Sequence, residues 1–426
     1  MPRFIFLLFL CFSCPKSNDD FIPKYDWNIL CYIAADNNLH NNSFGSLLKF
    51  IHSSWNDEKI NICFFCDGID KESVDDTGLA GYYLLRDGNI DLLEPLGEVN
   101  SGSKDTFTQF IDYFTSRYEA KHTALILWGH SDDVPIYGDS NSFLTDNGNG
   151  MSFDDYISSI NYAADKMRNK KLDVVISDSC RAMYAETALS IKADYFIAAQ
   201  ETQSGASLDY ARIMEYLQNS YYVDPENFAM KCGKFYEEFY SEGIYRQYKA
   251  RVVEKANDCI SVLNLSGNLE DGPGEFFRSE FPNFCYLLKE ALELENLSRK
   301  EIKKSLLKAT VNGSGHISRD LYCGIDFPKF ISLLSNHLND LNEDKIGKLK
   351  ESIEKIDKCL KNLIIFNYSR TNEILGGLSI RNVPPKKSIL FYQGMRGSSL
   401  GPPKKYSLGM MDNEDLWVEI MEEIYK

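Results

Sequence analysis

The first two hundred residues alternate between short apolar runs and amphipathic stretches, and this pattern limits the possible folds more than any other feature. The apolar runs are rich in β-branched and aliphatic side chains, so they predict strands buried on both faces of a sheet. Six strands are expected: Asn28–Ala34, Ile60–Phe65, Gly81–Leu85, Ala124–Trp128, Val174–Ser177 and Tyr195–Ala199. Helical patterns lie at Phe44–Ser53, Asp105–Tyr118, Phe153–Met167 and Met183–Ile191. This order predicts an α/β fold with a mostly parallel central sheet.

Two of the expected strands end in residues that can carry chemistry. One apolar run ends in Trp128-Gly129-His130 and another in Asp178-Ser179-Cys180, so the histidine precedes the cysteine by 50 positions. Ligands of open α/β sheets bind beyond the carboxyl ends of the strands, so we expect both side chains at one edge. A thiol attacks as the thiolate and needs a base or cation nearby. The pair predicts a Cys/His dyad with the spacing described for caspases.

Each member of this pair also has a structural interpretation. Met183 begins the last predicted helix, so Cys180 is expected near a helix N-terminus whose dipole favours the thiolate. The alternative is a buried strand-end cysteine, because cysteine is among the most buried residue types. The alternative for His130 is a structural histidine beside a glycine turn. The other five histidines lie in less suggestive places: His40, His52, His122, His316 and His337.

These motifs resemble the catalytic segments of the clostripain-like cysteine peptidases. The residues that carry the resemblance are Trp128-Gly129-His130, Asp178–Met183, Glu186 and Ala188, with flanking agreement at Trp27–Leu39 and Ala193–Glu201. Weaker similarity follows at Cys323–Phe327 and Gly376–Ile380. The resemblance implies a caspase-like α/β/α sandwich and an endopeptidase that cleaves after Arg or Lys. It also implies that Cys180 is the nucleophile and that His130 handles the protons.

The expected substrate pocket is acidic. Asp178 lies two positions before Cys180, so along a strand both side chains point to the same face. A buried carboxylate there would pair with the guanidinium or ammonium group of a substrate, and the resemblance implies a pocket of this kind. The alternative is a capping or turn aspartate. Four further candidates for the cleft are Glu201, Asp209, Asp36 and Asn37. For an Asp-Asn pair, a turn is the commoner use.

The residue after His130 departs from the family pattern. The family has glycine there, whereas this chain has Ser131. The resemblance implies that the backbone N–H groups of Ser131 and Cys180 stabilise the oxyanion. Serine keeps the N–H but does not readily adopt a backbone angle that requires glycine. This leaves open a second interpretation, a non-catalytic surface binding protein that retains the peptidase fold. A third is a thiol esterase or transpeptidase that uses the same dyad.

The two ends of the chain predict export and a helical extension. Arg3, the apolar run Phe4 to Phe12 and Cys14 resemble a bacterial lipoprotein signal, and the run is too short to span a membrane. We expect Cys14 to be lipidated, which gives a cell-surface or outer-membrane lipoprotein; free secretion is the alternative. Residues 1–20 would form the signal and tether, 21–240 the catalytic domain, and 241–426 a largely helical region packed on it.

The composition of the chain indicates which classes of partner it can bind. The formal net charge of −16 argues against nucleic-acid binding and favours cationic peptide or protein substrates. The dyad itself requires no cofactor. Calcium, which some relatives require, has possible ligands in the acidic loops Asp132-Asp133 and Asp139–Asp146, but these lack the EF-hand pattern and are also typical of solvated loops. Cys63 and Cys66 have zinc-like spacing without a second ligand pair, so with Cys31 they are predicted to pack as buried thiols.

Overall fold

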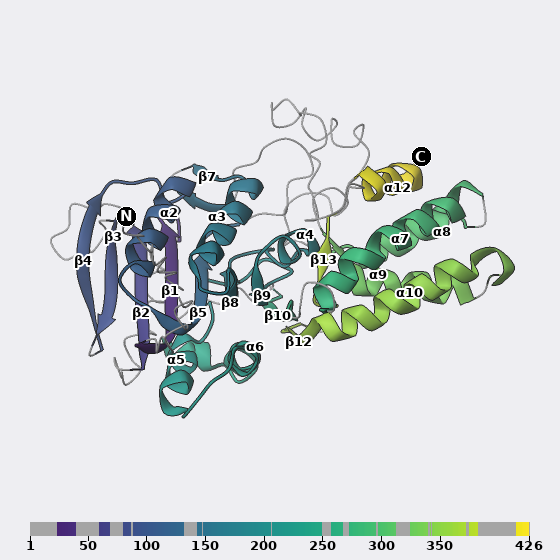
Figure 1. Ribbon diagram of the computed structural model, residues 1–426. Coiled ribbons are helices and arrows are strands. Elements are labelled where there is room, and N and C mark those ends of the chain that lie inside the picture. Colours follow the sequence, from purple (N-terminus) through teal and green to yellow (C-terminus); the bar gives the residue numbers. More distant parts are fainter. Residues whose placement is uncertain are drawn as a thin grey trace, which may run out of the picture.

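The computed structural model describes residues 24–39, 59–68, 80–86, 88–131, 143–146, 148–205, 207–248, 257–266, 272–294, 297–311, 324–339, 341, 343–371, 375–381 and 415–425. Its centre is a nine-stranded sheet in the order β12-β10-β9-β8-β5-β1-β2-β3-β4 (Figure 1). The strands are β1 (Tyr25–Ala35), β2 (Ile60–Gly68), β3 (Ala80–Arg86), β4 (Asn89–Gly97), β5 (Ala120–Trp128), β8 (Leu172–Asp178), β9 (Ala193–Ala198), β10 (Cys259–Asn264) and β12 (Ile364–Ser369). All six expected strands are confirmed. The five central strands, β9 to β2, pair in parallel, and antiparallel strands extend both edges.

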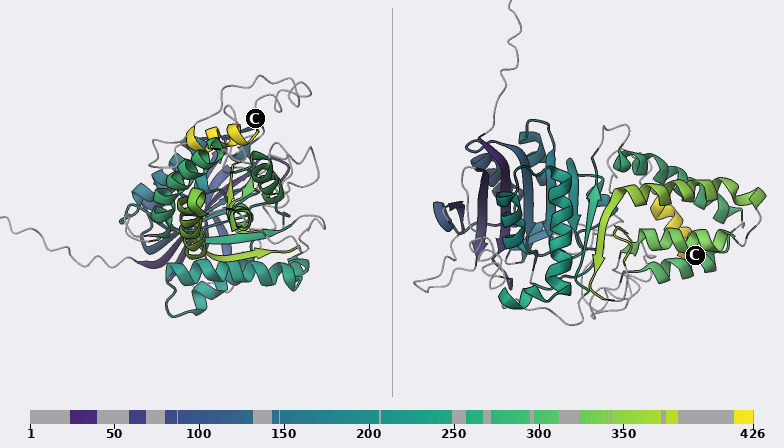
Figure 2. Two further views of the ribbon diagram at one scale, coloured as in Figure 1. Left: turned by 90° about the vertical axis from the view of Figure 1, so that its right-hand side faces the viewer. Right: turned by 90° about the horizontal axis from the view of Figure 1, so that it is seen from below.

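Helices cover both faces of the sheet. On one face lie α2 (Lys104–Thr115) and α3 (Phe153–Lys166), and on the other lie α5 (Tyr210–Asn219) and α6 (Pro225–Ser241) (Figures 1 and 2). Alternate side chains of each strand enter opposite cores; Tyr32 of β1 contributes to the α2/α3 core, whereas the buried Cys31 contributes to the α5/α6 core. Because both faces are covered, the central strands are apolar along nearly their whole length. The predicted α/β/α sandwich is confirmed.

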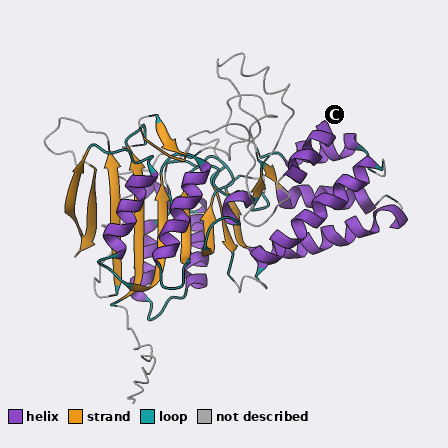
Figure 3. Ribbon diagram, turned by 45° about the horizontal axis from the view of Figure 1, so that its top comes forward, coloured by secondary structure: helices purple, strands orange, loops and turns teal. Residues whose placement is uncertain are grey.

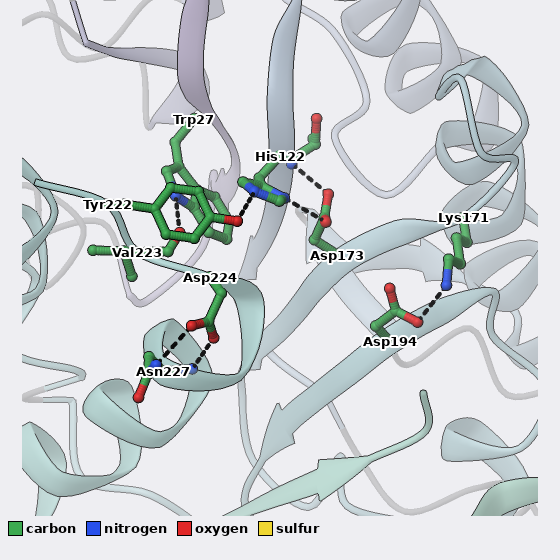
Figure 4. A network of polar contacts seen from close by, with 10 residues as sticks. Trp27, His122, Lys171, Asp173, Asp194, Tyr222, Val223, Asp224 and Asn227 are labelled. Carbon is green, nitrogen blue, oxygen red and sulfur yellow. Dashed lines mark hydrogen bonds and ion pairs between the residues drawn. The ribbon is translucent and has the colours of Figure 1, made fainter. Parts of the chain in front are cut away.

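Polar contacts tie the strands together at their amino ends (Figure 4). Nδ1 of His122, near the start of β5, lies 2.8 Å from Oδ1 of Asp173 in β8, and the backbone N–H of Thr123 donates to the other oxygen of that carboxylate at 2.8 Å. The indole of Trp27 in β1 donates to the carbonyl of Val223 at 3.1 Å. His122 thus serves the framework of the sheet, at the edge opposite to the predicted catalytic residues.

The C-terminal region is largely helical, as predicted, and extends beyond the β12 edge of the sheet (Figures 1 and 3). Its helices are α7 (Pro273–Glu293), α8 (Arg299–Ala309), α9 (Phe327–Asn339), α10 (Glu343–Leu363) and α12 (Asp415–Tyr425). The apolar side chains of these helices form one continuous core with the α2/α3 side of the sheet. Helix α7 ends at Glu293 and α8 begins at Arg299, while α9 ends at Asn339 and α10 begins at Glu343.

One sequence prediction needs correction. The helix expected over Met183–Ile191 is only the short α4 (Ala185–Ala188), because neighbouring segments hold the backbone before it extended. The N–H of Met183 donates to the carbonyl of Ala199 at 2.9 Å, and its carbonyl accepts from the N–H of Ser379 at 3.0 Å. A four-residue helix gives no appreciable dipole to Cys180. Strands β10 and β12 follow residue 240 and yet join the central sheet, while the domain boundary proposed there stays a prediction.

Two small sheets complete the description. Strands β6 (Phe143–Asp146) and β7 (Asn149–Met151) form one, and β11 (Ile325–Asp326) and β13 (Ser379–Ile380) form the other. The predicted leader, with Cys14, and the helix expected over Phe44–Ser53 lie outside the described residues. Across the part of the chain that is described, no helix combines the length and the apolar character needed to cross a membrane.

Candidate active site

The register of the central sheet brings the two predicted catalytic motifs together. Strands β5 and β8 are parallel neighbours, and Trp128 lies opposite Asp178. His130 and Cys180 each follow these partners by two residues, so both leave the carboxyl edge of the sheet side by side. They line one cavity of about 300 Å³. Its walls are formed by Leu39, Trp128, Gly129, His130, Ser131, Asp178, Ser179, Cys180, Arg181, Thr202, Gln203, Ser204, Gly205 and Ser207.

His130 is held by contacts of its ring and of its backbone. Its Nε2 lies 2.7 Å from Oδ1 of Asn38, which follows β1. Its carbonyl accepts a hydrogen bond from the N–H of Leu144 in β6 at 2.8 Å. Gly129 before it has a φ of +156°, and a Cβ there would lie 3.1 Å from the carbonyl oxygen of Ala34. A glycine therefore allows the chain to pass close to β1 and to aim His130 into the cavity.

The segment that carries Cys180 is fixed from two sides. The hydroxyl of Ser131 donates to the carbonyl of Cys180. The next residue, Arg181, has a φ of +49°, and its N–H donates to the carbonyl of Glu201 at 3.1 Å. Such a positive φ is uncommon for a residue with a side chain. It marks a sharp turn that the surrounding contacts hold in place. The turn places Cys180, which is partly exposed, in the wall of the cavity.

Ser131 itself does not need a glycine-like backbone. In the described part of the chain, the non-glycine residues with a positive φ are Leu144, Lys170, Arg181 and Ser207, and Ser131 is not among them. The serine therefore keeps its N–H in an ordinary backbone conformation while its hydroxyl donates to the carbonyl of Cys180. The geometric reason for expecting an impaired oxyanion site is thus removed.

The remaining described cysteines are buried, apart from Cys66, which is partly exposed. Burial raises the pKa of each of them, because a thiolate is poorly solvated in an apolar interior. For Cys66, Cys259 and Cys359 burial raises the pKa to about 12. The same direction holds for Cys31, Cys63, Cys232 and Cys285. Of the cysteines in the described residues, Cys180 is the one that lines the cavity shared with a histidine.

Asp178 forms part of the cavity wall, and its carboxylate also accepts hydrogen bonds from two hydroxyl groups. It is 5% exposed, and its Oδ2 accepts hydrogen bonds from the hydroxyls of Ser207 and Tyr210. Burial, followed by the nearby Asp178 carboxylate, raises the pKa of Tyr210 well above its usual value, so this phenol remains a proton donor. The carboxylate therefore joins the end of β8 to the segment that leads into α5, and lies beside the predicted nucleophile.

The other predicted site residues lie around this cavity rather than in its described lining. Asn37 follows β1 and makes a turn: its Oδ1 accepts from the N–H of Leu39 at 2.8 Å, and its Nδ2 donates to the carbonyl of Thr145 at 2.7 Å. Asp36 precedes it. Glu201 is buried after β9, and its carbonyl anchors the turn after Cys180.

Two further results concern residues outside the predicted dyad. Asp209 is the N-cap of α5 and accepts from the N–H of Arg212 at 3.4 Å. Asn38, which contacts His130, is not one of the predicted site residues, although it directly follows the predicted Asp36-Asn37 pair. Among the described residues no group of three His, Cys, Asp or Glu side chains is arranged to hold a metal ion; Asp132, Asp133 and Asp139 lie outside them.

Comparison with known proteins agrees with this geometry. A sequence model of the clostripain family matches residues 31–268, which include both strand-end motifs. The chain belongs to the clostripain family. It is therefore a cysteine endopeptidase, a hydrolase of peptide bonds. No curated protein matches the sequence.

Solved structures support the fold of this clostripain-family member. A secreted C11 cysteine protease from Bacteroides thetaiotaomicron, in complex with an irreversible peptide inhibitor, has a TM-score of 0.55 at 18% identity over 83% of this chain and 88% of its own. An inactive zymogen C11 protease from Parabacteroides distasonis has a TM-score of 0.55 at 18% identity, covering 88% of this chain and 97% of its own. At these identities the likeness establishes the caspase-like fold alone.

Proposed function

We propose that this peptidase cleaves after Arg or Lys, with Cys180 as the nucleophile and His130 as the general base and acid. The sulfur of Cys180 attacks the carbonyl carbon while its proton passes to His130, which then protonates the leaving amine. The resulting acyl-enzyme is hydrolysed by water. The backbone N–H groups of Ser131 and Cys180 are proposed to bind the oxyanion, since both residues line the same cavity.

The observation that carries this proposal is the shared cavity at the carboxyl edge of β5 and β8. It combines a partly exposed cysteine, a histidine from the neighbouring strand and a buried carboxylate. A volume of about 300 Å³ is at the lower end of the range for small-ligand pockets and suits one side chain of a peptide rather than a large cofactor.

Asp178 supports the basic specificity. It is the carboxylate in the described lining of the cavity, and it lies two residues before Cys180. A substrate ammonium or guanidinium group that reached it would form a charge-assisted hydrogen bond in a largely desolvated setting. Glu201, Asp36 and Asn37 are proposed to contribute to substrate binding from outside the described lining of the cavity. Asn37 does so by holding the turn that carries Leu39.

The test uses fluorogenic peptides that end in Arg, Lys, Asp, Asn or Ala, with wild type, Cys180→Ala and His130→Ala assayed together. We expect turnover after Arg and Lys that both variants abolish while circular dichroism stays unchanged. Asp178→Asn should lower kcat/KM for the basic peptides about 100-fold, as expected for loss of one partner of a desolvated charge pair. Any slow turnover measured with the Ala peptide should not fall in parallel.

Other outcomes separate the alternatives. Turnover after Asp or Asn would retain the dyad and refute the acidic pocket. Hydrolysis retained by Cys180→Ala would exclude this nucleophile. Silence on all five peptides, together with no labelling of Cys180 by a thiol-reactive probe, would favour the binding protein. An amine acceptor in the assay would reveal a transpeptidase by its coupled product.

Export, lipid anchoring and metal dependence belong to the same proposal. The N-terminal pattern supports a surface lipoprotein anchored through Cys14. Mass spectrometry of the mature N-terminus tests it, because a chain that begins elsewhere than at a lipidated Cys14 would contradict it. Assays with calcium and with a chelator test whether the acidic loops bind a metal that supports activity.

A further inference from the structure

The ring of His130 has a defined partner that the proposed dyad leaves unused. Nε2 of His130 lies 2.7 Å from Oδ1 of Asn38. An amide oxygen only accepts hydrogen bonds, so this contact requires the proton of the neutral imidazole on Nε2. The same contact leaves Nδ1 as the basic nitrogen of the ring. One hydrogen bond therefore selects both the tautomer and the orientation of the histidine.

The surrounding turn fixes where Asn38 stands. The side chain of Asn37 accepts from the N–H of Leu39 and donates to the carbonyl of Thr145, so it braces the turn on both sides of Asn38. The N–H of Leu144, the residue before Thr145, donates to the carbonyl of His130. Strand β6 thus binds both the backbone of His130 and the turn that carries Asn38. This short strand therefore helps to set the distance between the histidine and its partner.

We propose that Asn38 is a positioning residue for the peptidase reaction, which holds His130 in the tautomer and orientation needed to accept the proton of Cys180. This inference rests on the proposed function, because it gives His130 the role of base. Asn38 acts through the histidine, which its side chain contacts. Leu39, the next residue, is the part of this turn that lines the cavity.

The variants Asn38→Leu and Asn38→Asp test the assignment. The leucine removes the acceptor at similar size. Because Asn38 is exposed, water can partly replace its oxygen, so we expect kcat to fall about tenfold, the value of one hydrogen bond, with KM unchanged. Asn38→Asp keeps an acceptor and adds a negative charge beside the imidazole. It should retain kcat within about threefold and move the limb of the pH profile that reports His130 to higher pH, by up to about one unit.

Matched measurements separate this inference from the function on which it rests. Asn219→Leu, an exposed asparagine at the end of α5, controls for the exchange itself. If His130→Ala retains hydrolysis, the proposed function fails and Asn38 loses its role with it. If His130→Ala is inactive while Asn38→Leu keeps the kcat and pH profile of wild type, only the inference is overturned. Should Asn38→Leu fail to fold, an unshifted pH profile in Asn38→Asp gives the same refutation.

Discussion

Asp67 makes the stability of this protein depend on pH in a way that can be calculated. It lies near the end of β2 and is 2% exposed, and within the described residues its Oδ2 has no hydrogen-bond partner. Burial first, and then the charge of Asp146, raise the pKa of its carboxyl from 3.8 to about 7, and Asp36 acts in the same direction. The folded protein therefore holds a proton that the unfolded chain releases near pH 4.

The sign follows from this difference. A raised pKa stabilises the fold fully below pH 4, and the contribution is lost as the pH rises through 7. The whole shift, from 3.8 to about 7, corresponds to about 4 kcal/mol at 1.36 kcal/mol per pKa unit. Between pH 5 and pH 8 the loss is about 2.5 kcal/mol, since at pH 5 part of the gain has already gone.

Asp67→Asn removes this ionisation and keeps nearly the same shape. We expect the free energy of unfolding in urea to fall by about 2.5 kcal/mol less in the variant than in wild type between pH 5 and pH 8. Asp105→Asn, which removes an exposed carboxylate in the first turn of α2, controls for net charge. If the free energies of unfolding of Asp67→Asn and wild type differ by the same amount at pH 5 and at pH 8, Asp67 is not protonated in the folded protein.

Two further predictions concern contacts made by Glu186, which follows Cys180 in the chain, and by Ser131. Arg381 and Glu186 form a buried ion pair at 3.7 Å, so Arg381→Met alone should lower the free energy of unfolding by about 3 kcal/mol. Adding Glu186→Gln should recover part of this loss in urea titrations. If the two losses are additive instead, the pair does not interact. Ser131→Gly removes the hydroxyl that binds the carbonyl of Cys180 and should lower kcat a few-fold in the fluorogenic assay, whereas an increase would show that serine impairs the site.

The sequence predicts the central sheet well because its strands are buried on both faces. Continuous apolar runs such as the one in β5 leave little choice other than a parallel strand, and polar residues directly after them mark the reactive edge. These two patterns are enough to place His130 and Cys180 together. The same reasoning places Asp178 beside them, because residues two apart in a strand share a face.

The missed elements depend on contacts between distant segments. Strand β12 follows α10 without a break, so the helical pattern of that stretch hides it until β10 pairs with it. The segment from Met183 to Tyr184 has helical composition but is drawn into extended pairing with Ser379, almost two hundred residues away. Asn38 is likewise 92 positions from the ring it contacts. Local propensity carries no information about such partners.

The same long-range contacts show that the C-terminal half supports the proposed site directly. Ser204 of the cavity wall donates through its N–H and its hydroxyl to Asp258, just before β10, at 2.6 and 2.9 Å. Arg370, just after β12, lies 3.0 Å from that carboxylate. These hydrogen bonds and the ion pair join the cavity wall at Ser204 to the segments beside β10 and β12. Residues beyond 240 therefore support the cavity wall through Ser204, and a chain that ended there would lack this support.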